Sequence, residues 1–140
     1  MDKLYQVAVI GAGPVGSAAA YFLAKAGQEV LLLDKASFPR DKTCGDGLTP
    51  RALNILREMG LLEEVNRLGY RINQLEIFGP GNKALEAPIL APAGWPAYSL
   101  IVPRLILDNL LVRWARSSGA EFQGQVAVHN LSQTKDRVRD

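Results

Sequence analysis

Residues 5–16 read YQVAVIGAGPVG, and this stretch decides the fold. Its first half, Tyr5 to Ile10, is rich in β-branched residues and stops at a glycine, which predicts a buried parallel strand. Its second half is a G-x-G-x-x-G pattern formed by Gly11, Gly13 and Gly16. This pattern indicates a dinucleotide site only where a strand precedes it and a helix follows it.

A helix and a second strand do follow. Small and apolar residues dominate Pro14 to Ala26, with proline in the first turn and Gly27 just past the end. Glu29 to Leu33 is a short apolar run that ends at Asp34. The order strand, helix, strand predicts a right-handed crossover and a parallel sheet. The expected fold class is therefore α/β, with a Rossmann-type βαβ unit.

The glycines have separate physical roles in such a unit. Gly11 permits the tight turn, Gly13 lets the backbone approach a pyrophosphate, and Gly16 lets the helix pack closely on the strands. The helix N-terminus offers unpaired N–H groups and a partial positive charge to the anion. A glycine turn in another kind of α/β protein is the alternative. The cofactor-binding residues predicted from this pattern are Gly11, Ala12, Gly13, Pro14 and Gly16.

Asp34 stands 23 residues after Gly11, at the end of the second strand. A carboxylate there can accept hydrogen bonds from both ribose hydroxyls of an adenosine, and its charge repels a 2′-phosphate. This favours FAD or NAD over NADP. The alternative is an acid that is merely solvated at a strand end.

Composition narrows the function further. The chain has 140 residues, of which 48% are hydrophobic and 21% charged, which is typical of one globular domain. The net charge of +2 comes without a basic cluster, so we expect no nucleic-acid partner. One cysteine and one histidine exclude a disulfide framework and a metal cluster and favour a reducing, cytoplasmic compartment. No apolar run predicts a membrane span or a signal peptide.

The remaining chain alternates loops, helices and strands. Residues 36–49 lack any period and predict a long functional loop, and Thr49 followed by Pro50 predicts a capped helix. Short alternating runs then predict antiparallel strands and turns. The expected elements are helices over 50–59, 61–68 and 103–118, antiparallel strands within 71–100, and a strand over 127–132.

Three segments, GAGPVG, LLLDK and SFPRDKTCGDGLTPRAL, resemble the geranylgeranyl reductase family of FAD-dependent oxidoreductases, which are flavoproteins of the aromatic-hydroxylase type. The resemblance continues through IVPRLILDNLLVRWARSSGAEF, and K-x-C-G-D-G is its specific part. Family members are usually far longer, so we expect an N-terminal fragment. The expected parts are 1–70 as FAD-binding unit, 71–102 as the start of a β-rich substrate region, and 103–140 as a return to the FAD-binding domain.

The Cys44-Gly45-Asp46-Gly47 stretch is the candidate flavin loop. Its two glycines permit positive φ and close approach to a flat ligand. The resemblance implies that the loop passes the flavin ring, with Cys44 and Gly45 at the cofactor. A small buried hydrophobe is the alternative role for Cys44. Arg40 and Lys42 could meet phosphate oxygens or could be solvated loop charges.

Arg104 follows Pro103, which places a cation at the positive end of a helix dipole and calls for an anionic partner. Asp108, four residues on, is one candidate, and the cofactor is the other, because the family's V-x-R-x-x-x-D segment has an arginine that contacts FAD. Lys35 and Val128 complete the cofactor-binding set that the resemblance implies.

The resemblance implies reduction of carbon–carbon double bonds in an isoprenoid substrate by FAD, with NADPH or another electron donor and possible peripheral membrane contact. Trp95 could line a prenyl pocket or anchor a loop, and His129 reads as structural. A flavin monooxygenase or halogenase of the same fold is the alternative enzyme. A noncatalytic dinucleotide-binding module is the alternative from another class.

Overall fold

A computed structural model describes residues 3–44, 46–133 and 138–139. The chain forms two compact units, one of residues 1–41 with 107–140 and the other of residues 42–106. The α/β class predicted from the sequence is confirmed by a parallel sheet, antiparallel sheets and intervening helices. The divisions expected at residues 70 and 102 stay a prediction about the complete protein.

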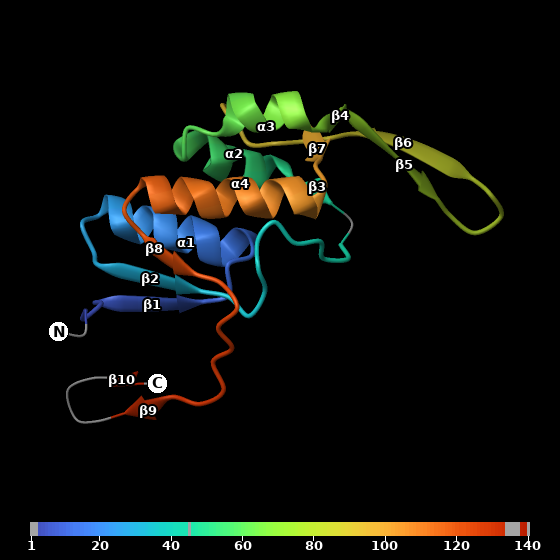
Figure 1. Ribbon diagram of the computed structural model, residues 1–140. Coiled ribbons are helices and arrows are strands. Elements are labelled where there is room, and N and C mark those ends of the chain that lie inside the picture. Colours follow the sequence, from blue (N-terminus) through green and yellow to red (C-terminus); the bar gives the residue numbers. More distant parts are fainter. Residues whose placement is uncertain (1–2, 45, 134–137, 140) are drawn as a thin grey trace. The chain divides into compact units, whose positions relative to one another are not determined.

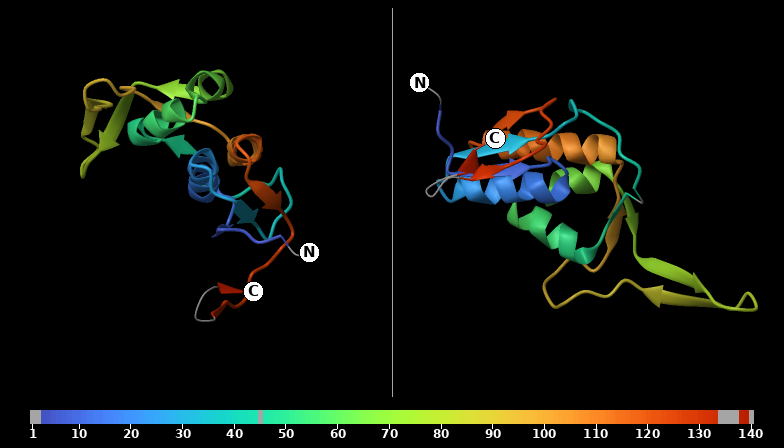
Figure 2. Two further views of the ribbon diagram at one scale, coloured as in Figure 1. Left: turned by 90° about the vertical axis from the view of Figure 1, so that its left-hand side faces the viewer. Right: turned by 90° about the horizontal axis from the view of Figure 1, so that it is seen from below.

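The first unit contains the predicted βαβ motif (Figure 1). Strand β1 (Val7–Ile10), helix α1 (Pro14–Lys25) and strand β2 (Val30–Leu33) follow one another, and β1 pairs in parallel with β2. Strand β8 (Glu121–Gln123) pairs in parallel with the other side of β2, which gives the order β1-β2-β8. Figure 2 shows α1 and the later part of helix α4 (Arg104–Ser117) side by side over one face of this sheet.

The core of this unit lies between the helices and the sheet. Strand β2 is in the middle of the sheet and is buried along most of its length. Fully buried apolar side chains come from both layers, namely Ala20, Val30, Leu32, Leu107, Leu111, Val112 and Ala115.

Two sequence-based expectations about this sheet are wrong. Strand β1 was expected to be buried, but it is the outer strand among the described residues, and its side chains alternate between half-buried and exposed. Residues 127–131 form no strand, and the third parallel strand is β8. The sequence predicts a strand over 127–132, but the third parallel strand is the segment after α4 that pairs with the free edge of β2.

The second unit has two antiparallel sheets and two helices. Strands β3 (Gly47–Leu48), β7 (Ser99–Ile101) and β4 (Tyr70–Ile72) form one sheet, in that order. Strands β5 (Gln74–Phe78) and β6 (Ala84–Pro88) form a hairpin. Helices α2 (Pro50–Glu58) and α3 (Leu62–Leu68) complete the unit. The predicted antiparallel texture of 71–100 is therefore confirmed.

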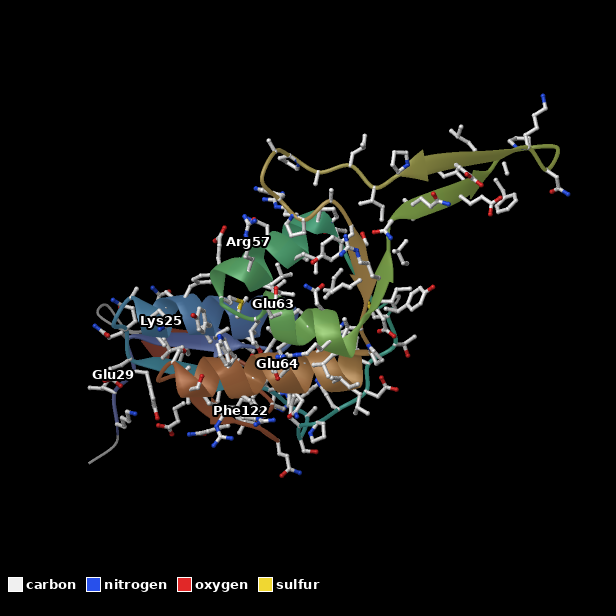
Figure 3. The ribbon with its side chains drawn as sticks, turned by 90° about the horizontal axis from the view of Figure 1, so that it is seen from above. Lys25, Glu29, Arg57, Glu63, Glu64 and Phe122 are labelled. Atoms are coloured by element: carbon white, nitrogen blue, oxygen red, sulfur yellow. The ribbon has the colours of Figure 1, made fainter. Side chains whose placement is uncertain are left out.

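Helix α2 begins where its sequence predicts. Thr49 is the N-cap and accepts a hydrogen bond from the Ala52 amide at 3.4 Å, and Pro50 occupies the first turn. At the other end Arg57, labelled in Figure 3, donates to the Gly94 carbonyl oxygen at 2.5 Å. Helix α2 is therefore tied to the loop that contains Trp95, which is half-buried there.

Two short strands, β9 (Ser132–Gln133) and β10 (Val138–Arg139), pair antiparallel at the end of the described chain. None of the helices in the described part of the chain has the length and apolar character that crossing a bilayer requires.

Candidate functional site

The glycine turn joins β1 to α1, and each glycine stands there for a different reason. Gly11 has φ +98°, a conformation that L side chains rarely adopt. A Cβ on Gly16 would lie 1.8 Å from the Gly11 carbonyl oxygen, so only glycine lets the helix approach the strand. Gly13 is the N-cap of α1 with φ −71°, which any residue can adopt. Its own backbone conformation therefore does not demand glycine.

Glycine at position 13 is expected where a pyrophosphate approaches the backbone. Gly13 provides no side-chain cap for α1, and the first turn of the helix carries no acidic residue. The first N–H groups of a helix have no intrahelical partner, and together with the helix dipole they attract an anion. A bare N-terminus beside a residue without Cβ therefore fits a pyrophosphate.

The Asp34 carboxylate fixes this turn from the end of β2. One oxygen, Oδ2, accepts a hydrogen bond from the Ala12 amide at 2.8 Å, and Oδ1 accepts one from the Ala36 amide at 2.8 Å. A carboxylate has about four lone-pair sites, so two acceptor positions remain for ribose hydroxyls. The alternative of a merely solvated acid is wrong, since Asp34 is 8% exposed and bonded twice to backbone.

Ser17 is a further element of the turn that the sequence analysis missed. It is fully buried, and its hydroxyl donates to the Ala12 carbonyl oxygen at 3.0 Å. Asp34 and Ser17 thus hold both backbone groups of Ala12. A serine directly after Gly16 was the available signal, but a small polar residue early in a helix gives no hint of this partner.

Arg40 lies near two carboxylates. Its Nη1 lies 3.2 Å from Asp108 Oδ2, and its Nη2 lies 3.8 Å from Asp34 Oδ2. The Phe38 ring lies 4.9 Å from the guanidinium carbon and meets the ring of Phe122, labelled in Figure 3, edge to face. The Arg40 side chain is 14% exposed, so the alternative of a solvated loop charge is wrong, and its contact with a phosphate stays a prediction.

Asp108 has a partner that the sequence analysis did not consider. It is fully buried in α4 and pairs with Arg40, which comes from the loop after β2. Sequence reasoning considered only a partner on the same helix. The contact with Arg40 joins residues far apart in the chain, and no local spacing indicates it.

The other predicted residues of the first unit lie around Asp34. Lys35 follows it directly and is exposed. The Val126 amide donates to the Asp34 carbonyl oxygen at 3.0 Å, so the chain after β8 runs beside the end of β2. Val128 is two residues further on and is half-buried. Their contact with a cofactor stays a prediction.

The second unit contains the candidate flavin loop. Gly47 lies in β3 and pairs with Ile101, and the Asp46 carbonyl oxygen accepts a hydrogen bond from the Val102 amide at 2.9 Å. The CGDG loop is therefore joined to the segment that leads into Arg104. Arg104 is half-buried at the start of α4, as predicted, and both partners considered for it stay predictions.

The loop also corrects two expectations. Gly47 was expected to adopt positive φ, but it is extended in β3, and Asp46 takes the left-handed conformation with φ 53°. Cys44 is exposed, so its alternative role as a buried hydrophobe is wrong. Lys42 is exposed.

Gly45 lies outside the described residues, so its position at the cofactor stays a prediction. No group of three or more metal-ligating side chains occurs within the described residues.

The chain is similar to several known proteins. It is 39% identical to menaquinone reductase of Mycobacterium tuberculosis, over 94% of this chain and 32% of that protein. It is 31% identical to digeranylgeranylglycerophospholipid reductase 2 of Methanopyrus kandleri, over 85% of this chain and 28% of that protein. The solved structure of the myxobacterial chondrochloren halogenase matches with a TM-score of 0.87 and 26% identity, over 97% of this chain and 32% of that chain.

The chain thus spans about a third of the length of these relatives. The family described as "FAD binding domain" matches residues 4–140. The glycine turn, the open N-terminus of α1 and Asp34 provide what the adenosine and pyrophosphate of FAD require. By this match and this geometry, the chain belongs to the FAD binding domain family of flavin-dependent oxidoreductases, monooxygenases and halogenases.

Proposed function

We propose that this chain is the N-terminal, FAD-binding part of an oxidoreductase that reduces carbon–carbon double bonds of an isoprenoid chain. The observation that carries the FAD assignment is Asp34, which fixes the glycine turn and keeps two acceptor positions for a ribose. The names of two relatives support the substrate class, because menaquinone and digeranylgeranylglycerophospholipid both carry isoprenoid chains.

Bound FAD would supply hydride transfer, as flavins do. The residues of this chain would bind and orient it. Gly13 and the first N–H groups of α1 would bind the pyrophosphate, and Asp34 would bind the ribose. The resemblance to geranylgeranyl reductases assigns Cys44 and Arg104 to the flavin end.

The remaining parts of the proposal concern the complete protein. The substrate is a small isoprenoid molecule, and NADPH or another donor supplies the electrons. The protein is cytoplasmic, with peripheral contact to the membrane that holds its substrate, and it binds no nucleic acid.

A flavin-dependent monooxygenase or halogenase is the second candidate. The TM-score of 0.87 with the chondrochloren halogenase favours it, because 97% of this chain matches part of that enzyme. A noncatalytic nucleotide-binding module is the third. All three candidates would bind a nucleotide with the same glycine turn and Asp34, so these residues do not distinguish them.

Anaerobic reduction of the purified complete protein separates these candidates. For a reductase we expect a yellow protein that dithionite bleaches, that reoxidises slowly in air, and that adds two hydrogens per double bond to a geranylgeranyl lipid, measured by mass spectrometry. Rapid oxygen consumption with substrate indicates the monooxygenase or halogenase. A protein that binds FAD but neither reduces the lipid nor consumes oxygen with substrate indicates the noncatalytic module.

A further inference from the structure

The backbone of Ala12 is held from two sides by side chains of other elements. Its amide donates a hydrogen bond to Asp34 Oδ2 at 2.8 Å, and its carbonyl oxygen accepts one from the Ser17 hydroxyl at 3.0 Å. Ala12 and Ser17 are both fully buried. A buried carbonyl oxygen that loses its partner costs free energy, so the Ser17 hydroxyl fixes the direction in which this carbonyl points.

The direction of this carbonyl decides the direction of the next amide. The peptide bond between Ala12 and Gly13 is trans, so its C=O and N–H groups point in opposite directions. Ser17 lies within α1, and a carbonyl that points to Ser17 therefore turns the Gly13 N–H away from the helix. The free N–H groups at a helix N-terminus point to that same side, where they attract an anion.

The Gly13 amide is especially important in this helix because the next residue has none. Pro14 occupies the first turn and lacks an N–H. Helix geometry directs the amides of Val15 and Gly16, but Gly13 precedes the helix as its N-cap and is extended, with ψ −176°. The direction of its amide therefore depends on the hydrogen bond that Ser17 makes.

We propose that Ser17 is a positioning residue of the flavin site, which aims the Gly13 N–H at the pyrophosphate. Ser17 is fully buried, so it acts through the Ala12 carbonyl rather than by touching the cofactor. The inference rests on the proposed binding of FAD at the glycine turn. Asp34 would thus bind the ribose, while Ser17 prepares the turn for the pyrophosphate.

Ser17→Ala removes the hydroxyl and tests the proposal. Alanine favours a helix more than serine does, so a loss of binding could not come from a weaker α1. Ser17→Thr keeps the hydroxyl and should retain the binding of the wild type. Ser118→Ala is the matched control, because Ser118, just past the end of α4 in the same unit, also donates to a helix carbonyl, that of Ala115 at 2.6 Å.

The measurement is the binding of adenosine and ADP to the flavin-free complete protein, followed by NMR titration. The two probes differ only by the pyrophosphate. We expect the wild type to prefer ADP by at least about tenfold, since hydrogen bonds to charged groups are strong. In Ser17→Ala the affinity for ADP should fall about tenfold while the affinity for adenosine stays unchanged. Ser17→Thr and Ser118→Ala should keep both affinities.

Equal weakening of both probes in Ser17→Ala would show a merely structural role and overturn the proposal, as would an unchanged affinity for ADP. A folded Ser17→Thr that behaves like Ser17→Ala would also overturn it, and where Ser17→Thr does not fold, the result for Ser17→Ala decides alone. Where Ser17→Ala does not fold, Ser17→Cys takes its place, because a thiol has nearly the same shape and donates only weakly. A wild type that contains FAD but does not prefer ADP overturns only this inference, whereas one that binds neither FAD nor ADP overturns the proposed function as well.

Discussion

The carbonyl oxygen of Gly11 occupies the space that a Cβ on Gly16 would need, at a separation of 1.8 Å. The contact is between backbone and backbone, so neither a side chain nor a rotamer can relieve it. This close approach is what lets α1 begin directly above the end of β1.

Gly16→Ala should therefore destabilise the first unit by about 3 kcal/mol, at the upper end of the cost of overpacking. Chemical unfolding followed by circular dichroism measures this. Ala18→Gly, further along α1, is the matched control and should cost only about 1 kcal/mol through helix propensity. Equal losses of unfolding free energy in the two variants would contradict the steric explanation.

Gly13→Val should abolish flavin binding, because its side chain would enter the space of the pyrophosphate. Stability should change little, since φ at Gly13 is −71° and suits any residue. The flavin content of the purified complete protein, read from its visible absorbance, checks this. A variant that stays equally yellow would remove Gly13 from the site.

Asp34→Asn should weaken FAD binding by about 1–3 kcal/mol, since a charge-assisted ribose bond becomes a neutral one. It should also destabilise the turn, because an amide has one acceptor oxygen where the carboxylate serves both Ala12 and Ala36. Fluorescence titration with FAD measures the first effect. Asp41→Asn, an exposed acid of the following loop, should leave the affinity unaltered, and equal affinity in Asp34→Asn would argue against the ribose contact.

Hydrogen bonds from Tyr5, Lys3 and Gln123 lower the pKa of Glu121 from 4.5 to about 2. A carboxyl group whose pKa is depressed on folding contributes stability above its unfolded pKa and loses that contribution as the pH falls through the folded pKa. The contribution of Glu121 to the free energy of unfolding should thus be fully present above pH 4.5 and be lost as the pH falls toward 2. The stability difference between wild type and Glu121→Gln should shrink across this range, and a difference that is constant with pH would disprove the assignment.

One face of the β5–β6 hairpin exposes Leu75, Ile77 and Leu85, which are 51%, 53% and 64% accessible. Contiguous exposed apolar surface promotes association. Residues 1–140 expressed alone should therefore self-associate in sedimentation velocity and bind FAD weakly or not at all. Ile77→Lys should reduce the association, whereas Gln74→Lys, on the opposite face of β5, should not. Tight FAD binding by a monodisperse monomer would refute this expectation.

The local elements could be predicted because short-range chemistry fixes them. Pro14 and Gly27 bound α1 as their backbone preferences require, and Thr49 with Pro50 begins α2. The glycine turn and Asp34 likewise follow from spacing alone, which is why the nucleotide end of the site was visible in the sequence.

The errors all concern contacts between distant segments. The sequence predicts a strand over 127–132, but the parallel partner of β2 is β8, because sheet pairing depends on which segment reaches the free edge of β2. The sequence permits positive φ at Gly47, but its pairing with Ile101 extends it, and Asp46 adopts positive φ instead.

The sequence by itself therefore determined the βαβ unit, the phosphate-binding turn and the acid at the ribose end, since each depends on residues in consecutive elements of the chain. Only the tertiary structure decided that Asp34 binds the Ala12 amide and that Arg40 lies between Asp34 and the buried Asp108. The physical reason is that a charge is buried only with a partner, and the fold, rather than spacing along the chain, determines which partner comes within reach.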